Sequence, residues 1–136
     1  MLVPAIIRRM DQPQGTVLQL DAEHAAFIQG AVSVVVSSRN SQHVPDVVRG
    51  CGCRVTRDRR RVTVLVEAAR AGSVLDDIAA NGLIAVVFSQ PSTHRTIQLK
   101  GSDARVTRVT GADRVIAQRH LQAWVQDLQL IGYAAD

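Results

Sequence analysis

NGLIAVVFSQPSTHRTIQLKG, residues 81–101, decides the fold of this chain. Its unbroken apolar run, Leu83–Phe88, predicts a strand that is covered on both faces. A short turn with Pro91 and Ser92 follows, and the alternating run His94–Lys100 then predicts a second strand. Alternation means that one face of the second strand lies on the core, while the other is free for water or a ligand.

Two sets of side chains are candidates for that free face, because neighbours along a strand point to opposite sides. One set is Arg95 and Ile97, and the other is Thr96 and Gln98. The pattern is compatible with either set.

Working outward, the remaining segments predict strands joined by short helices and turns. Strands are expected at Ala31–Ser37, Pro45–Thr56 and Val62–Val66, and Gly101 permits the second strand to bend and run on through Ala104–Val109. Helices are expected at Asp21–Gln29, where Asp21 is the cap, at Ser73–Ala80, and from Thr110 onward.

The helix ends carry recognisable signals. Ser73 with Asp76 and Thr110 with Asp113 both have capping-box spacing. Asn81-Gly82 suits a C-cap, because both residues tolerate left-handed backbone angles.

The last helix has a broad apolar face and must therefore pack on something. The residues that recur at helical intervals are Val115, Ile116, Ala117, Leu121, Trp124, Val125, Leu128 and Ile131. In a small barrel with few aromatic residues, Trp124 is expected in the core or at an interface rather than stacked on a ligand.

Length and composition indicate one domain, residues 1–136. Apolar residues make up 46% of the chain, but the aromatic ones are only Phe27, Phe88, Trp124 and Tyr133, so the core must be mainly aliphatic.

An apolar run of eighteen residues is absent, which argues against a transmembrane helix. At the N-terminus the basic residues follow the short apolar run, the reverse of a secretory signal, so a cytoplasmic location is expected.

Cys51 and Cys53 are the only cysteines, two residues apart on a predicted strand. A disulfide between them would close a very tight loop, and the histidines show no partner spacing for a metal site. Two reduced structural thiols are the favoured interpretation, with redox chemistry or metal binding as alternatives.

Arginine supplies fifteen of the sixteen basic residues, and Lys100 is the only lysine. Guanidinium groups bind phosphate in fork geometry, so this excess suits phosphorylated ligands and nucleic acid alike, although a coding bias explains it equally well. The cluster Arg57–Arg61 is interpreted as a solvated turn, with an anion or nucleic-acid patch as the alternative. Nucleic acid is not the expected partner, because single-strand binders need aromatic platforms.

Four pieces of the chain, in this order, resemble the flavin-binding split-barrel proteins related to pyridoxamine 5′-phosphate oxidase. They are Ala26–Val36, Pro45–Val55, Asn81–Pro91 and Arg95–Gly101, and the resemblance spans roughly residues 21–130. In that family a strand R-Q-V-R-x-x-G follows an apolar strand introduced by Asn-Pro or Asn-Gly. The resemblance implies a mainly β, α+β fold: a six-stranded antiparallel Greek-key split β-barrel with short flanking helices and a C-terminal helix.

The same resemblance implies a site for flavin mononucleotide (FMN). The family's R-x-V-L-L-K strand corresponds to Arg49–Arg54, whose two cations lie five residues apart and would face opposite sides of a regular strand. A bulge at Gly50 and Gly52 would correct this, or these glycines would let the backbone approach the ligand. The alternative is an edge strand with two solvated arginines.

Other family elements are matched only in part. Of the family's Ser-Arg-Lys only Arg70 survives, with Ser73 as a substitute donor, and the ring-contacting glutamine corresponds to Thr96. The predicted cofactor-binding residues are Arg49, Gly50, Cys51, Arg54, Arg70, Ser73, Arg95, Thr96 and Gln98. No catalytic residue and no metal ligand is assigned.

The function implied is FMN binding in a homodimer with the flavin between subunits, and flavin-dependent oxidoreductase activity on an unknown substrate. The family's C-terminal Trp and Arg pair is not matched, so pyridoxamine phosphate oxidation is not expected. Whether the chain is an enzyme is left open. The alternatives are a dimeric, non-enzymatic binding module without flavin, or a deazaflavin or haem in place of FMN.

Overall fold

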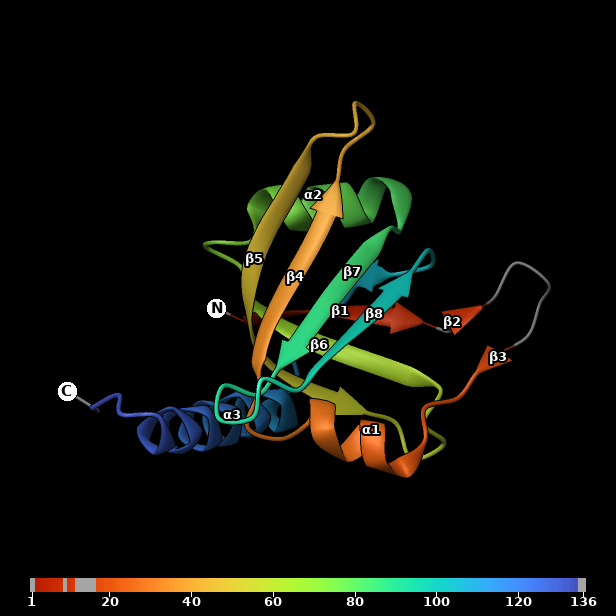
Figure 1. The fold of residues 1–136 in the computed structure, drawn as a ribbon. Helices are drawn as coiled ribbons and strands as arrows, with labels where there is room; N and C mark the ends of the chain where they lie inside the picture. The colour runs from red at the N-terminus through yellow and green to blue at the C-terminus, as the bar shows by residue number, and fades with distance from the viewer. Residues whose placement is uncertain (1, 9, 12–16, 135–136) are drawn as a thin grey trace.

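A computed structural model describes residues 2–8, 10–11 and 17–134 of the chain and shows a mainly antiparallel sheet with three helices, an α+β architecture (Figure 1). The strands are β1 (Leu2–Arg8), β2 (Met10–Asp11), β3 (Val17–Leu18), β4 (Ser33–Arg39), β5 (Pro45–Val55), β6 (Arg61–Glu67), β7 (Ile84–Ser89), β8 (Thr96–Gly101) and β9 (Arg105–Val106). The helices are α1 (Ala22–Ile28), α2 (Gly72–Asn81) and α3 (Gly111–Leu130).

Seven strands form one sheet in the order β8-β7-β4-β5-β6-β1-β9, and β2 pairs only with β3. The long strand β5 joins two layers, because residues 45–49 pair with β4 whereas residues 50–55 pair with β6. Figure 1 shows the consequence: β4, β7 and β8 run in front, while β6 and β1 cross behind them. The pairings among the described residues leave β8 and β9 as edges, so they do not close the sheet into a barrel.

The core lies between these layers and is built almost entirely from aliphatic side chains, as the composition predicts. Val34, Val36, Val64 and Val86 are completely buried, and Phe88 is the one aromatic residue buried with them. β-Branched residues suit this position because they pack well on a pleated surface. All of the buried hydrophobic residues except Leu65 belong to a single cluster.

The predicted strand at residues 83–88 is confirmed as β7, but it is covered on one face only. Ile84, Val86 and Phe88 point into the core, whereas Ala85 and Val87 are only half-buried on the outer face. The prediction that both faces of this strand are covered is therefore wrong for a single chain. An apolar strip is left at the surface.

β8 resolves the choice left by the sequence pattern. Ile97 and Leu99 turn inward, while Thr96, Gln98 and Lys100 are exposed on the outer face. Arg95 precedes the strand.

α2 confirms one predicted end and contradicts the other. Gly82 has the left-handed φ of 70° expected of the C-cap. The N-cap, however, is Ala71, without a side-chain capping bond, so Ser73 does not form the predicted capping box. Ala71 is fully buried, and its carbonyl accepts the first helical bond from the Leu75 N–H, so the helix begins before Ser73.

β1, β2 and β3 were not expected from the sequence, and β9 does not continue β8 as expected. β1 pairs antiparallel with β6 along its whole length, although the N-terminal segment had suggested no strand. The segment after Gly101 does not extend β8; the chain turns, and Arg105–Val106 pairs with β1 instead.

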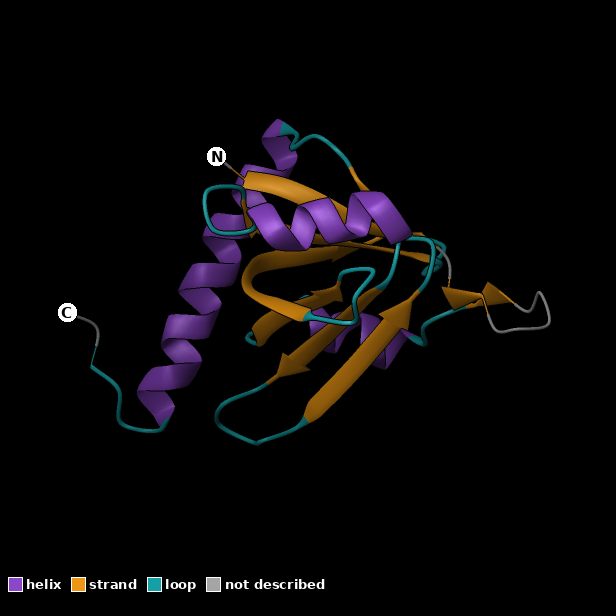
Figure 2. Cartoon of the chain, turned by 90° about the horizontal axis from the view of Figure 1, so that it is seen from above, coloured by secondary structure: helices purple, strands orange, loops and turns teal. Residues whose placement is uncertain are grey.

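α3 starts at the predicted capping box: the Thr110 hydroxyl accepts from the Asp113 N–H, and the Asp113 carboxylate accepts from the Thr110 N–H. Figure 2 shows α3 running beside the strands, while α2 lies across them. In the described part of the chain, no helix is long and apolar enough to cross a membrane.

Candidate functional site

The outer face of β5, β4, β7 and β8 carries several of the predicted site residues. Directly paired residues share a face, and the pairs Arg49–Val35, Val35–Val87 and Val87–Gln98 form one row across the four strands. Arg49 and Gln98 therefore lie on the same face, but three strand spacings apart, roughly 14 Å. Thr96 lies on the β8 side of this face.

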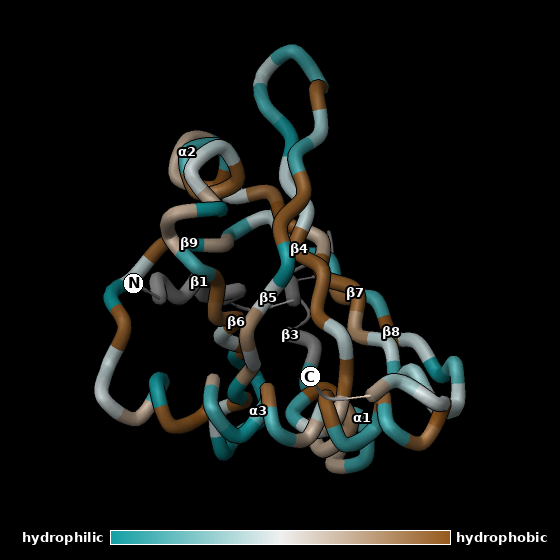
Figure 3. The backbone as a smooth tube through the Cα atoms, turned by 90° about the vertical axis from the view of Figure 1, so that its left-hand side faces the viewer, coloured by the Kyte–Doolittle hydropathy of each residue, from teal (hydrophilic) through white to brown (hydrophobic). Residues whose placement is uncertain are grey.

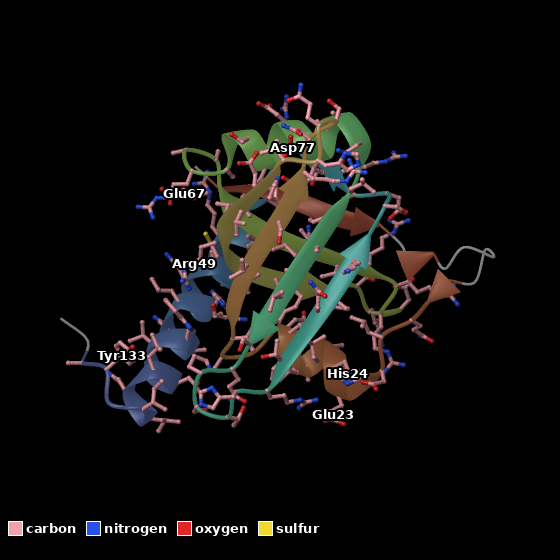
Figure 4. The ribbon with its side chains drawn as sticks, turned by 45° about the horizontal axis from the view of Figure 1, so that its top comes forward. Glu23, His24, Arg49, Glu67, Asp77 and Tyr133 are labelled. Carbon is pink, nitrogen blue, oxygen red and sulfur yellow. The ribbon has the colours of Figure 1, made fainter. Side chains whose placement is uncertain are left out.

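A cavity of about 430 Å³ lies where α3 meets this sheet, at the Arg49 end of the row. We call it the α3 cavity; its lining includes Ser33, Arg49, Gly50, Cys51, Glu67, Arg70, Arg114, Gln118, His120, Leu121 and Trp124. Figure 4 shows Arg49 beside α3, with Glu67 further toward α2. Four of the predicted residues, Arg49, Gly50, Cys51 and Arg70, thus meet in one cavity.

Arg49 is held at the wall of the α3 cavity by two contacts. Its Nη1 donates to the Ser33 hydroxyl at 3.3 Å, and its Cζ lies 5.1 Å from the centre of the Trp124 ring. The second distance is a cation–π contact between the sheet and α3. The guanidinium group keeps donors that are available to a ligand.

The other charged groups leave the cavity positive. Arg70 Nε lies 3.4 Å from Glu67 Oε2, and both side chains are well exposed, so this ion pair is weak. Arg114, on the first turns of α3, adds a third guanidinium group. One carboxylate thus faces three guanidinium groups among the lining residues, an excess that favours an anionic ligand.

Two ring nitrogens on α3 contribute differently. His120 Nε2 lies 2.6 Å from the Val32 carbonyl oxygen, and because a carbonyl only accepts, this nitrogen must carry a proton. Trp124 Nε1 is buried, and no group in the described part of the chain accepts its hydrogen. A buried indole N–H is usually bonded, so the unsatisfied Trp124 donor is an exception among buried polar groups.

The predicted bulge is confirmed, since the β5–β6 register shifts between Gly50 and Gly52. At both glycines, other atoms of the chain occupy the space into which a side chain would extend, so that space is not open to a ligand. A Cβ on Gly50 would lie 2.6 Å from Val34 Cγ1, and one on Gly52 would lie 3.4 Å from Ile116 Cγ2 of α3. Gly52 also has a φ of 153°, which favours glycine. The glycines therefore serve close packing of β4 and α3 on β5.

Arg54, like Arg49, contacts α3, but it forms an ion pair within the chain instead of lining the cavity. Its Nε lies 2.6 Å from Asp113 Oδ1, and Asp113 is completely buried. Burial raises the pKa of Asp113, but hydrogen bonds from Arg54 and Thr110 outweigh it and hold this pKa below its ordinary value. Arg54 thus anchors the start of α3, and its charge is already paired.

The bulge also separates the two cysteines, which a regular strand would have placed side by side. Cys51 lines the α3 cavity, and Cys53 is buried in the core; neither forms a disulfide. Burial, with a smaller contribution from Glu67, raises the pKa of the Cys51 thiol, so it is not an activated nucleophile. Among the described residues, no three potential ligands converge on a metal position.

The remaining predicted residues lie elsewhere. Ser73 is on the exposed first turn of α2. Arg95 Nη2 donates to Glu23 Oε1 at 2.9 Å and lies over the Phe27 ring, so it binds α1. The Thr96 hydroxyl lies 2.9 Å from the Ser89 hydroxyl across β7 and β8.

The sequence reasoning missed the contribution of α3 to this site. Arg114 with Gln118, and His120 with Trp124, are each four residues apart, so each pair lies side by side on the helix, whereas Gln118 and His120 are only two apart and point to different sides. That spacing was visible, but which strand the helix crosses was not. Comparison of the chain with protein-family models, curated proteins and solved structures gave no significant match.

Proposed function

We propose that this chain binds FMN in the α3 cavity. The observation that carries the proposal is the combination of three guanidinium groups and one indole ring in a single cavity of about 430 Å³. Ligand cavities of this kind are typically roughly 300–1,000 Å³. The resemblance to flavin-binding split-barrel proteins supports FMN among phosphorylated aromatic ligands, with a deazaflavin as a related alternative.

The donor set fits the two ends of such a ligand. Arg49, Arg70 and Arg114 would hold the phosphate, because guanidinium forks bind phosphate oxygens with charge assistance. Trp124 and the apolar wall would cover the ring. The flavin when bound would supply hydride or electron transfer. The chain's own part is binding, orientation and exclusion of water.

A homodimer would complete the site. Thr96 and Gln98 share the outer face with Arg49 but lie too far away to touch the same ring within one chain. Val35 and Val87, half-buried in the middle of this face, and Val47, 64% exposed, offer apolar surface for a second copy. Two split barrels packed through this face would bring one copy's β8 toward the other's α3 cavity. We therefore propose a dimeric split barrel and a flavin-dependent oxidoreductase of unknown substrate, not a pyridoxamine phosphate oxidase.

Titration of FMN into the apo-protein, followed by flavin fluorescence, tests the proposal. Arg49→Ala should weaken binding roughly 10- to 150-fold, because a charge-assisted hydrogen bond contributes roughly 1.5–3 kcal/mol. Arg59→Ala, in the exposed turn between β5 and β6, is the matched control and should leave the affinity nearly unchanged. A loss of affinity with Arg59→Ala and none with Arg49→Ala would move the site to the basic turn and contradict the proposal.

A second candidate is a dimeric binding module without flavin. It is favoured by the internal partners of two cavity cations, since Arg49 already contacts Trp124 and Arg70 already pairs with Glu67. Sedimentation separates the outcomes. A dimer that does not quench FMN would support the binding module, whereas a monomer at micromolar concentration would contradict the shared site.

A further inference from the structure

A second cavity, of about 520 Å³, lies on the same outer face but at its α2 end. We call it the α2-end cavity; the residues that matter here are Ser37, Arg39, Leu83, Ala85, Lys100 and Ser102. None of them belongs to the α3 cavity. In Figure 4 the labelled Asp77 on α2 marks this end of the sheet, and Arg49 lies lower on the sheet, beside α3.

Side-chain size explains the hollow. Ser37 pairs with Ala85 and Ala85 pairs with Lys100, so these three form one row across β4, β7 and β8. Two small residues thus make the floor, and a long cationic side chain stands at its β8 side. Arg39 is two residues beyond Ser37 on β4 and therefore points to the same face. The hollow lies between an arginine and the chain's only lysine.

Hydrogen bonds of Asn81 connect the two segments that form the walls of the α2-end cavity. Asn81 Nδ2 donates to the Arg39 carbonyl at 2.7 Å, and the Leu83 N–H donates to Asn81 Oδ1 at 2.8 Å. One asparagine therefore ties the end of β4 to the segment that enters β7. Gly82 fits below Ser102 with left-handed geometry, since a Cβ there would lie 2.8 Å from the Ser102 carbonyl oxygen.

A further contact fixes the same end of β4. The Ser38 hydroxyl donates to Asp77 Oδ2 at 2.7 Å, and both residues are buried, so α2 is anchored directly beneath the cavity. Arg39 Nη1 donates to the neighbouring Asn40 carbonyl at 3.1 Å, which leaves its other donors for a ligand. Such bracing reduces the entropy that a ligand must offset on binding.

From this arrangement we propose that the α2-end cavity binds a small phosphate monoester with an apolar end. Two cations flank the hollow and the Ser37 and Ser102 hydroxyls lie at it, a donor set that matches a tetrahedral dianion. The described lining residues include two cations, Arg39 and Lys100, and no carboxylate. Leu83 and Ala85 supply apolar surface for the remainder of the molecule. The site uses none of the residues that line the α3 cavity, although Ser37 pairs with Val47, which the proposed dimer would bring against the second copy.

The single lysine makes the test direct. Reductive methylation with carbon-13 keeps the charge of Lys100 and gives one side-chain NMR signal from this cavity. Phenyl phosphate is the probe, added to the whole protein in the assembly that it forms in solution. The Lys100 signal should shift in a saturable manner, and Arg39→Gln should weaken the binding about tenfold or more. Arg59→Gln, on the distant turn, should leave it unchanged.

Phenol, which has the same ring without the phosphate, should not shift the signal. A Lys100 signal that does not respond to millimolar phenyl phosphate, or a response that Arg39→Gln leaves intact, overturns the proposal. Circular dichroism checks that the variant is folded. FMN quenching by the same Arg39→Gln sample should persist, so failure of this site and failure of the flavin site give different results.

Discussion

α2 and α3 pack on the same sheet by opposite means. α2 buries apolar side chains, Val74 and Ile78, and extends the hydrophobic core. The residues that α3 buries completely are two carboxylates, Asp113 near its start and Asp127 near its end. α2 is held mainly by apolar burial, with the Ser38–Asp77 hydrogen bond beside it, whereas α3 is held at its ends by hydrogen bonds and an ion pair.

The α3 attachment is specific at both ends. Asp113 is bonded to Arg54 on β5 and to the Thr110 N–H. Asp127 accepts from the Ser92 N–H at 2.9 Å, from the Ser92 hydroxyl at 2.7 Å and from Gln90 Nε2 at 3.2 Å, all in the β7–β8 loop. Between these clamps Trp124 and His120 are only half-buried.

The consequence is an apolar helix surface that one chain does not cover. Leu121 is 57% exposed, and Val115 and Ile131 are also exposed. The helix packs as predicted, through Ile116, Ala117 and Val125, which are half-buried, while the three exposed residues stay uncovered within one chain. Figure 3 shows apolar and polar segments alternating along α3, and it also shows the tip of the β4–β5 hairpin projecting beyond α2.

The largest effect is expected where a helix is held by the core. Ile78→Ala removes a side chain that is 1% exposed, and it should lower the free energy of unfolding by about 2–5 kcal/mol, from lost burial and a residual cavity. Chemical denaturation followed by far-ultraviolet circular dichroism measures this change. The matched control is Leu121→Ala on α3, which should change stability by less than about 0.5 kcal/mol in the monomer. Equal losses would show that α3 is packed as tightly as α2.

Acid should release α3 before the sheet unfolds. Burial raises the pKa of Asp127, but hydrogen bonds from Ser92 and Gln90 outweigh it, so the pKa values of both Asp113 and Asp127 lie below the ordinary value. Their contribution is complete above the unfolded pKa of about 3.9 and is lost as the pH falls through the lower folded values. Trp124, the only tryptophan, should shift its emission to the red below about pH 4, while the β signal persists.

Asp113→Asn supplies the control at neutral pH. It leaves Arg54 without its carboxylate and weakens the helix cap, at a cost of about 1–3 kcal/mol, so part of the same red shift should be present without acid. If the Trp124 emission changes only together with the β signal, α3 is not a separately held element.

How far the sequence determines these features depends on the range of the interactions. The strands at β4–β8 and the C-cap at Gly82 follow from local patterns, and so does the bulge that was suggested by Gly50 and Gly52. The pairing of β1 with β6 could not be predicted from local patterns. The paired residues are about sixty positions apart in the chain, and the sequence around each strand does not indicate its partner.

The same dependence on long-range contacts decides which residues of the site could be predicted from the sequence. Arg49 and Arg70 were predicted from the resemblance to the flavin-binding family, and both line the α3 cavity. That Arg54 would be occupied by Asp113, 59 residues further on, depends on where α3 crosses β5, which neither residue's surroundings specify.

The smallest effect separates two helix starts that look alike in the sequence. Thr110 with Asp113 and Ser73 with Asp76 have the same spacing, but only the first pair forms a capping box. Thr110→Ala should therefore cost about 1 kcal/mol, since it removes the acceptor for the Asp113 N–H. Ser73→Ala should cost less than about 0.5 kcal/mol, because Ser73 lies inside the first turn of α2, on the exposed side. Thermal unfolding of the two variants in parallel measures the difference. A larger loss for Ser73→Ala would mean that α2 begins at Ser73 in solution, and the buried position of Ala71 would then have to be abandoned.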